Sequence, residues 1–133
     1  MSNEKINKIA VWGLGKHAIK NILPALRKIK NIEIIGIQSR NINTVSENCK
    51  EFNCKTWESP EEMLLDPLID IIYLSTPPGL HFQQAKKILK SNKHLWCEKP
   101  LTINYQHTKD LIELSNKNLL SICEGFMYFY HPQ

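Results

Sequence analysis

Apolar and polar positions follow two different rhythms along the chain. Six stretches are expected to form strands, most of them nearly continuous apolar runs typical of strands buried on both faces: residues 6–12, 32–40, 55–57, 69–74, 94–97 and 119–123. Between them, apolar residues recur at helical spacing, which predicts helices over residues 16–30, 43–52, 80–91 and 104–116. Ser59 and Pro60 start a further short helix, and Pro24 is expected to kink the first one.

This alternation of strands and helices predicts an α/β fold. Successive parallel strands need crossover helices, and right-handed crossovers place those helices on both faces of one sheet. The expected architecture is a doubly wound parallel sheet in a single three-layer αβα domain, with the strand order 3-2-1-4-5-6. Ligands of such sheets bind beyond the carboxyl ends of the strands, so the residues that follow each strand are the candidates for a site.

The first strand runs into a turn rich in small residues. Gly13, Gly15 and Ala18 form the G-x-G-x-x-A pattern of a dinucleotide-binding Rossmann turn. Gly13 allows the tight turn, Gly15 lets the backbone approach a pyrophosphate, and Ala18 lets the helix pack on the strand. The free N–H groups of the helix start then face the anion, and the whole turn is predicted to bind a cofactor, including Leu14, Lys16 and His17.

The end of the second strand bears on which dinucleotide is preferred. An NAD site favours an acidic residue there, which accepts from the ribose 2′-OH, but this end carries Ser39 and Arg40. Glu33 has the expected spacing from Gly13 but starts its strand, so it lies at the wrong edge. Ser39 and Arg40 suit a 2′-phosphate, which favours NADP over NAD. The alternative is a solvated polar turn.

Two later strand ends carry further candidates. The fourth strand leads into Ser75, Thr76, Pro77 and Pro78, a stiff turn at the functional edge of the sheet, and His81 is expected to face the cleft from the first turn of the next helix. A rigid turn that merely opens the helix, with a surface histidine, is the alternative.

Glu98, Lys99 and Pro100 close the fifth strand. Lys99, held by a proline beside a carboxylate, is the candidate catalytic residue, because partial burial next to a nicotinamide would suit its amine to proton transfer. A salt-bridged surface lysine is the alternative.

Composition narrows the class of protein. The chain has 133 residues, 42% hydrophobic and 23% charged, and a net charge of +4 without a basic stripe, which disfavours nucleic-acid binding. No apolar run approaches the roughly 20 residues that span a bilayer, and the polar start predicts no signal peptide, so a cytoplasmic location is expected. The four cysteines are irregularly spaced, which predicts neither a metal site nor a disulfide.

Taken in order, these motifs and the final E-x-F-M-Y-x-Y-H-P-Q resemble the Gfo/Idh/MocA oxidoreductases. The resemblance implies hydride transfer between NAD(P) and a sugar, polyol or diol carbon, with Lys99 contacting substrate and helping to move the hydroxyl proton. It implies that Glu98 and Pro100 shape the nicotinamide site, and that the segment with Thr76, Pro77, Pro78 and His81 lines the cofactor. The sequence departs from the family pattern at His17, Phe129 and Gly125, which weakens inference about the substrate.

The resemblance also sets the expected domain organisation. Residues 1–126 are expected to form the NAD(P)-binding domain, and residues 127–133 the start of a connection to a C-terminal substrate domain that this sequence lacks. The chain alone is then expected to be nearly inactive, with an exposed apolar patch at residues 126–130. An oligomer remains compatible with it. The alternative is a stand-alone Rossmann module that senses a nucleotide or binds a partner without catalysis, and whose apolar surface is covered.

Overall fold

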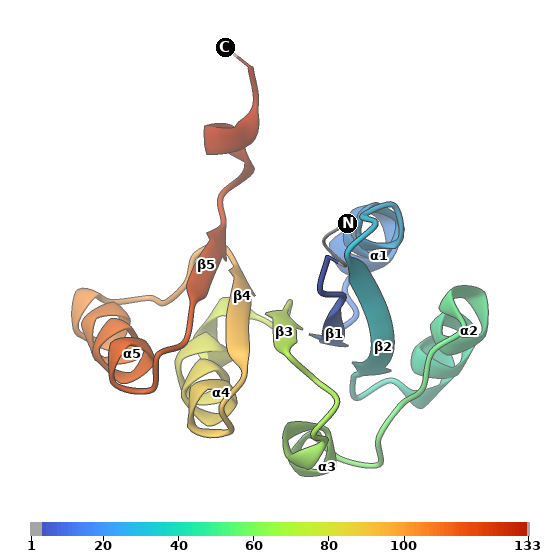
Figure 1. Ribbon diagram of the computed structural model, residues 1–133, viewed down its shortest axis with the longest axis horizontal. Coiled ribbons are helices and arrows are strands. Elements are labelled where there is room, and N and C mark those ends of the chain that lie inside the picture. Colours follow the sequence, from blue (N-terminus) through green and yellow to red (C-terminus); the bar gives the residue numbers. More distant parts are fainter. Residues whose placement is uncertain (1–3, 133) are drawn as a thin grey trace.

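The computed structural model describes residues 4–132, so the first three residues of the predicted domain and Gln133 of the predicted connection lie outside the described part. One parallel sheet has the order β2-β1-β3-β4-β5 (Figure 1). Its strands are β1 (Asn7–Trp12), β2 (Ile32–Gln38), β3 (Ile71–Leu74), β4 (His94–Glu98) and β5 (Ile122–Gly125). The candidate strand at residues 55–57 is reduced to one parallel bridge, Lys55 with Gly36, on the outer side of β2. The α/β fold and the predicted order 3-2-1-4-5-6 are confirmed.

Helices cover both faces of this sheet. They are α1 (Leu23–Arg27), α2 (Ile42–Phe52), α3 (Pro60–Leu65), α4 (Pro78–Lys90) and α5 (Tyr105–Lys117). A π-helical turn, η1 (Ala18–Ile22), precedes α1, and a 3-10 turn, η2 (Met127–Tyr130), follows β5. The π turn stands where Pro24 was expected to kink the first helix, because a proline cannot donate to the preceding turn and its ring crowds the carbonyl four residues earlier.

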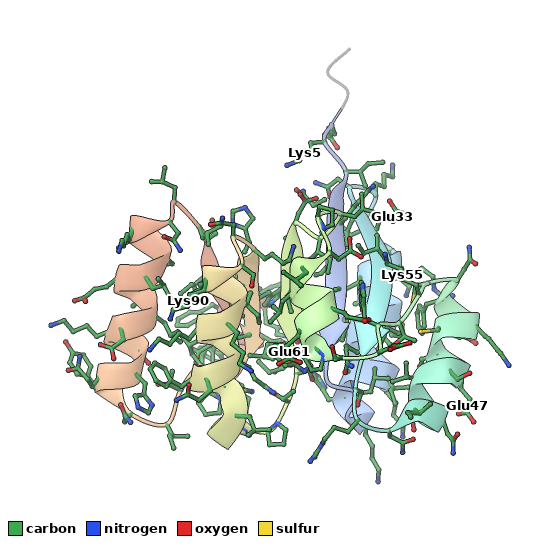
Figure 2. The ribbon with its side chains drawn as sticks, turned by 90° about the horizontal axis from the view of Figure 1, so that it is seen from below. Lys5, Glu33, Glu47, Lys55, Glu61 and Lys90 are labelled. Carbon is green, nitrogen blue, oxygen red and sulfur yellow. The ribbon has the colours of Figure 1, made fainter. Side chains whose placement is uncertain are left out.

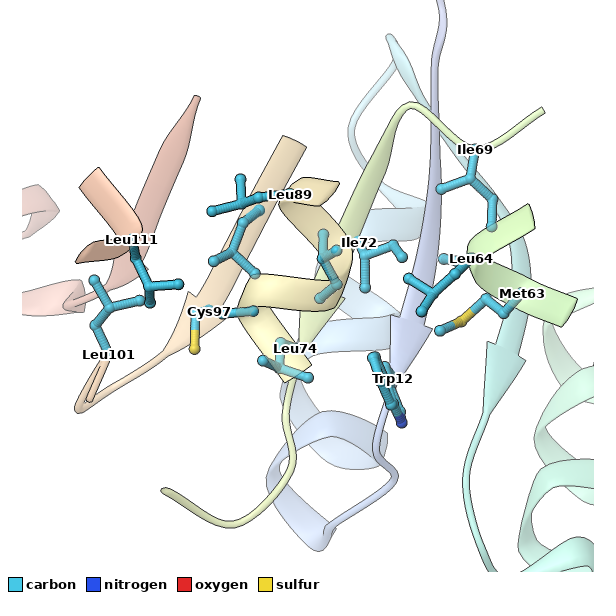
Figure 3. Packing of buried hydrophobic residues seen from close by; sticks show 14 residues of the cluster. Trp12, Met63, Leu64, Ile69, Ile72, Leu74, Leu89, Cys97, Leu101 and Leu111 are labelled. Carbon is cyan, nitrogen blue, oxygen red and sulfur yellow. The ribbon is translucent and has the colours of Figure 1, made fainter. Parts of the chain in front are cut away.

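Alternate residues of the strands point to opposite faces of the sheet, where they form two separate hydrophobic cores. Ala10, Trp12 and Leu74 point to one face, where they pack under α3, α4 and α5 (Figure 3). Val11 and Tyr73, which alternate with them, point to the other face with the buried residues of α1. The pleat of the strands therefore builds a three-layer αβα arrangement.

The last strand starts later than the predicted residues 119–123. Leu119 has a left-handed backbone (φ 56°) and is 90% exposed, and Leu120 N–H donates to the Ser115 carbonyl at 2.8 Å. These residues finish α5 instead of extending a strand, because the unpaired carbonyls of its last turn take up the following N–H groups.

The Asp66 carboxylate stabilises the segment that forms the parallel bridge between Lys55 and Gly36. It accepts hydrogen bonds from Lys55 Nζ (2.5 Å), Trp57 Nε1 (3.0 Å) and Leu68 N–H (2.9 Å). Partial burial raises the pKa of this carboxyl, but the hydrogen bonds outweigh burial and lower the pKa from 3.8 to about 2. The Trp57 ring in turn lies over Gly36, where a side chain would clash with it.

Charged side chains of both signs are spread over the molecule. Figure 2 shows Lys90 on α4, Glu61 on α3 and Glu47 on α2, with Lys5 and Glu33 near the amino-terminal edge of the sheet. Within residues 4–132, no helix has both the length and the apolar character needed to cross a membrane.

Candidate functional site

A cleft of about 1100 Å³ opens at the carboxyl edge of the sheet. Twelve residues predicted to form the site line it: Gly13, Leu14, Gly15, Lys16, His17, Ser39, Arg40, Ser75, Thr76, Pro77, Glu98 and Lys99. They come from the ends of four strands and are far apart in sequence, so the parallel sheet brings them together. Four further candidates, Ala18, Pro78, His81 and Pro100, are not among the lining residues.

The glycine turn has the geometry that its sequence predicts. Gly13 has a positive φ of 100°, and its N–H donates to the Gln38 carbonyl at 2.8 Å, which ties the turn to β2. A Cβ at Gly13 would lie 2.7 Å from the Ser75 carbonyl carbon, whereas a Cβ at Gly15 would meet nothing within 4 Å. Gly15 therefore borders open space in the cleft. Ala18 is fully buried behind the turn.

The end of β2 carries a basic residue, Arg40, at the cleft and no acidic residue. Ser39 is partly exposed, and Arg40 is exposed beside it. Glu33 pairs in register with Lys8 at the start of β1, whereas Gln38 pairs with Trp12 at its end. Glu33 therefore lies at the opposite edge, as the sequence predicts.

The turn after β3 is stiff and internally bonded. Ser75 N–H donates to the Trp12 carbonyl at 2.8 Å, and the Thr76 hydroxyl donates to Gln84 Oε1. Pro77 caps α4, and Pro78 is its first residue. Pro78 thus opens the helix outside the cleft, whereas the other three residues of the turn line the cleft.

Glu98 joins the glycine turn to the end of β4. Its Oε1 accepts from the Tyr73 hydroxyl and lies 3.3 Å from His17 Nε2, while His17 Nδ1 lies 3.0 Å from the Asn21 amide nitrogen. Burial, together with the hydrogen bond to Glu98, raises the pKa of the Tyr73 hydroxyl, which keeps it protonated as a donor. Its hydrogen bond thereby fixes the carboxylate beside Lys99.

Lys99 is an exposed residue of the cleft. Its side chain lines the cleft, and its expected partial burial next to a nicotinamide stays a prediction. Among residues 4–132 Lys99 forms no ion pair, so the salt-bridged alternative is not found there. The amine therefore stands in solvent at the rim of the cleft.

His81 does not face the cleft, which corrects the prediction from sequence. It is fully buried under the cleft floor, with Nε2 2.7 Å from the Thr76 carbonyl oxygen and Nδ1 2.8 Å from the Pro100 carbonyl oxygen. Helical spacing placed His81 in the first turn of α4, but the apolar face of that turn points down to the sheet. Pro100 contacts the His81 ring through its backbone carbonyl oxygen.

Eight lining residues were not predicted: Trp12, Gln38, Ile42, Glu58, Pro60, Leu80, Gln84 and Met127. Glu58 and Pro60 follow the candidate strand at residues 55–57, so the rule about strand ends could have found them. Gln84 lies on the α4 turn after His81, and Met127 reaches the cleft only through the path of the chain after β5. The described residues, 4–132, contain no group of three or more His, Cys, Asp or Glu side chains that could hold a metal ion, and all four cysteines are free.

Comparison with known proteins identifies oxidoreductases as relatives. A dTDP-3,4-didehydro-2,6-dideoxy-alpha-D-glucose 3-reductase of Saccharopolyspora spinosa is 29% identical over 124 residues, which cover 93% of this chain and 37% of that protein. A D-xylose 1-dehydrogenase (NADP(+)) of Hypocrea jecorina is also 29% identical, over 93% of this chain and 34% of its own length. The chain thus spans little more than a third of these relatives.

A solved structure gives the same result for the fold. KijD10, a 3-ketoreductase from Actinomadura kijaniata in complex with NADP and TDP-benzene, superimposes with a TM-score of 0.92 at 28% identity, over 96% of this chain and 39% of that one. A family model described as an oxidoreductase family with an NAD-binding Rossmann fold matches residues 7–126. The resemblance found in the sequence is confirmed: the chain belongs to the Gfo/Idh/MocA oxidoreductase family.

Proposed function

We propose that this chain binds NADP(H) in the cleft and forms the cofactor-binding part of an oxidoreductase. The observation that carries the proposal is the convergence of twelve predicted residues on one cleft at the carboxyl edge of the sheet. The family description, and relatives whose names or complexes include NADP, support the same cofactor.

The chemistry of the lining residues fits this cofactor. Gly15 leaves open space for a pyrophosphate at the start of a helix, where unpaired N–H groups and Lys16 favour an anion. The exposed Arg40 and the Ser39 hydroxyl suit a 2′-phosphate, whereas a carboxylate in their place would repel it. We therefore propose NADP as the preferred cofactor, with NAD as the weaker ligand.

The reaction that this part of the family fold would serve is hydride transfer to or from a sugar-like or diol carbon, in line with the names of the two relatives. The bound nicotinamide supplies or accepts the hydride. In the direction of reduction, the substrate oxygen gains a proton, and we assign its delivery to the Lys99 ammonium group, which becomes the neutral amine. Glu98 lies next to Lys99 in the chain and is held by Tyr73, so it would fix the local shape of this end of the cleft.

We further propose that a second domain packs against this one from residue 127 onward. Five consecutive apolar side chains are 37% to 78% exposed: Phe126, Met127, Tyr128, Phe129 and Tyr130. Beside them, a groove of about 560 Å³ is lined by Trp96 of β4 and Cys123 of β5, among other residues. An uncovered patch of this kind favours domain contact over a self-contained module. Because Lys99 is exposed, the chain alone should turn over substrate slowly.

The test is a titration of the purified chain with NADPH and NADH, followed by the fluorescence of the reduced nicotinamide. NADPH should bind more tightly, and R40A should weaken NADPH binding by roughly tenfold or more while leaving NADH binding nearly unchanged, because only NADPH carries the 2′-phosphate. R27A is the matched control, since Arg27 lies on α1 outside the cleft. If neither cofactor binds, the proposed function is wrong; if NADH binds more tightly, only the roles of Ser39 and Arg40 are lost.

A further inference from the structure

His81 is a fully buried polar side chain beneath the cleft, and it links its own helix to two other elements. The imidazole comes from α4, and its Nε2 lies 2.7 Å from the carbonyl oxygen of Thr76 in the turn after β3. Its Nδ1 lies 2.8 Å from the carbonyl oxygen of Pro100 and 3.3 Å from Cys97 Sγ, both at the end of β4. One rigid ring thus bridges the two turns that carry Thr76 and Lys99.

Each ring nitrogen lies within hydrogen-bond distance of one carbonyl oxygen. A carbonyl oxygen only accepts, so both contacts are hydrogen bonds when both ring nitrogens carry a proton. A carbonyl that loses its donor inside the protein favours another conformation of its turn, in which it is paired again. Removal of the ring would therefore release both turns together, whereas a change at either turn alone would release one.

The contacts that hold the Lys99 turn in place come from the residues on either side of Lys99. On one side, Glu98 pairs with Gly125 in the sheet. On the other, the Pro100 carbonyl meets His81, and Leu101 N–H donates to Glu124 Oε2 at 2.6 Å. The exposed Lys99 side chain adds no ion pair of its own within the described residues, so these contacts fix only the backbone from which its side chain extends.

We propose that His81 is a positioning residue, whose imidazole ties the Thr76 turn to the Lys99 turn and thereby sets the position of Lys99 across the cleft. It acts through two backbone carbonyls and does not touch the cleft. The proposal rests on the proposed function only for the chemical role of Lys99; the bridge itself is a property of the folded chain.

Three substitutions separate the two halves of the bridge. H81A removes both donors. H81N keeps an amide nitrogen near the place of Nδ1, so it should retain the contact to Pro100, and H81Q keeps one near the place of Nε2, so it should retain the contact to Thr76. H94A is the matched control, because His94 is at the opposite end of β4 and outside the cleft.

The measurement is amide hydrogen exchange of each variant by NMR, without cofactor. H81A should speed exchange at Leu101 and Leu80, whose N–H groups are hydrogen-bonded in the folded chain, at least tenfold relative to β1. H81N should restore protection at Leu101 but not at Leu80, and H81Q should do the reverse. H94A should change neither of the two by more than about twofold relative to β1.

Two results would overturn the proposal. One is an even rise of exchange across the whole sheet in all three His81 variants, which would mean that the ring only fills space. The other needs no variant: in the wild-type chain labelled with 15N-histidine, fewer than two slowly exchanging ring N–H signals from His81 would exclude a bridge to both carbonyls. Because both readouts are taken without NADPH, they are independent of the titration on which the proposed function depends.

Discussion

The two glycines of the first turn should respond to alanine in different ways. Gly13 lies between β1 and the turn after β3, and its backbone φ of 100° is unfavourable for a residue with a side chain. A Cβ there would lie 2.7 Å from both the carbonyl carbon and the carbonyl oxygen of Ser75. Gly15, two residues later, has no heavy atom within 4 Å of the place where its Cβ would lie. G13A should therefore damage the fold, and G15A only the binding of cofactor.

The magnitudes follow from these contacts. Carbon atoms normally approach to about 3.5–4.0 Å, so G13A must push Ser75 away from β1 and strain the 2.8 Å hydrogen bond from Ser75 N–H to the Trp12 carbonyl. Overpacking costs about 1–3 kcal/mol, and a positive φ costs a non-glycine residue about another 1–2 kcal/mol. The total of about 2–5 kcal/mol corresponds to a fall in Tm of roughly 7–18 °C for a chain of this length. G15A should change the free energy of unfolding by less than about 0.5 kcal/mol.

Thermal unfolding by circular dichroism and NADPH titration together make the test. G15A should keep the wild-type Tm and weaken NADPH binding tenfold or more, because its methyl group occupies the space next to which the pyrophosphate should lie. G79A is the matched control: Gly79 lies in α4 outside the cleft, with open space around its Cβ position, so alanine should leave binding unchanged and stabilise the helix by up to about 1 kcal/mol.

Two outcomes would refute this reasoning. A G13A variant with the wild-type Tm would show that the turn accommodates a side chain, against the measured approach to Ser75. A G15A variant that binds NADPH as tightly as wild type would show that no ligand group approaches this part of the cleft, and the assignment of the turn to a pyrophosphate would then be wrong.

Three other predictions concern the rest of the molecule. G36A should destabilise the chain by about 2–4 kcal/mol in urea unfolding, because the new methyl group would clash with the Trp57 ring; unchanged stability would contradict that packing. D66N should lower stability at neutral pH by up to about 2 kcal/mol, since the pKa of Asp66 is lowered to about 2; wild type should lose this advantage as the pH falls from about 4 through 2, and a constant difference down to pH 1 would refute it. Thiol reagents at pH 7 should label the exposed Cys123 first, because burial raises the pKa of Cys54 to about 12 and leaves almost no thiolate; equal labelling would contradict this.

Most of the fold could be predicted from the sequence, because the pattern of apolar residues indicates which strand and helix positions are buried. A strand covered on both faces must be apolar throughout, so residues 32–38 and 71–74 could be recognised without any knowledge of their neighbours. The errors lie at helix ends, where backbone hydrogen bonding decides. Leu119 is apolar and was expected to start a strand, but it completes the last turn of α5 and is exposed.

The site was readable for a similar reason. Parallel strands all present their carboxyl ends at one edge, so a rule about strand ends gathered Gly13, Arg40, Thr76 and Lys99 without any measured distance. The same rule could not say which way a helical side chain points. It therefore placed His81 in the cleft, although the ring is turned beneath the floor.

By itself, the sequence determined the α/β class, the strand order, the glycine-rich turn and the edge at which the candidate site lies, because these depend on the local period of apolar residues and on backbone rules that hold within each segment. Only the tertiary structure decided which side chains meet across segments. The contact of His17 with Glu98, the bridge from His81 to the Thr76 and Pro100 carbonyls, and the exposure of Lys99 all join or separate residues far apart in the chain. Such contacts depend on side-chain direction and on the space left between packed elements, which no single segment contains.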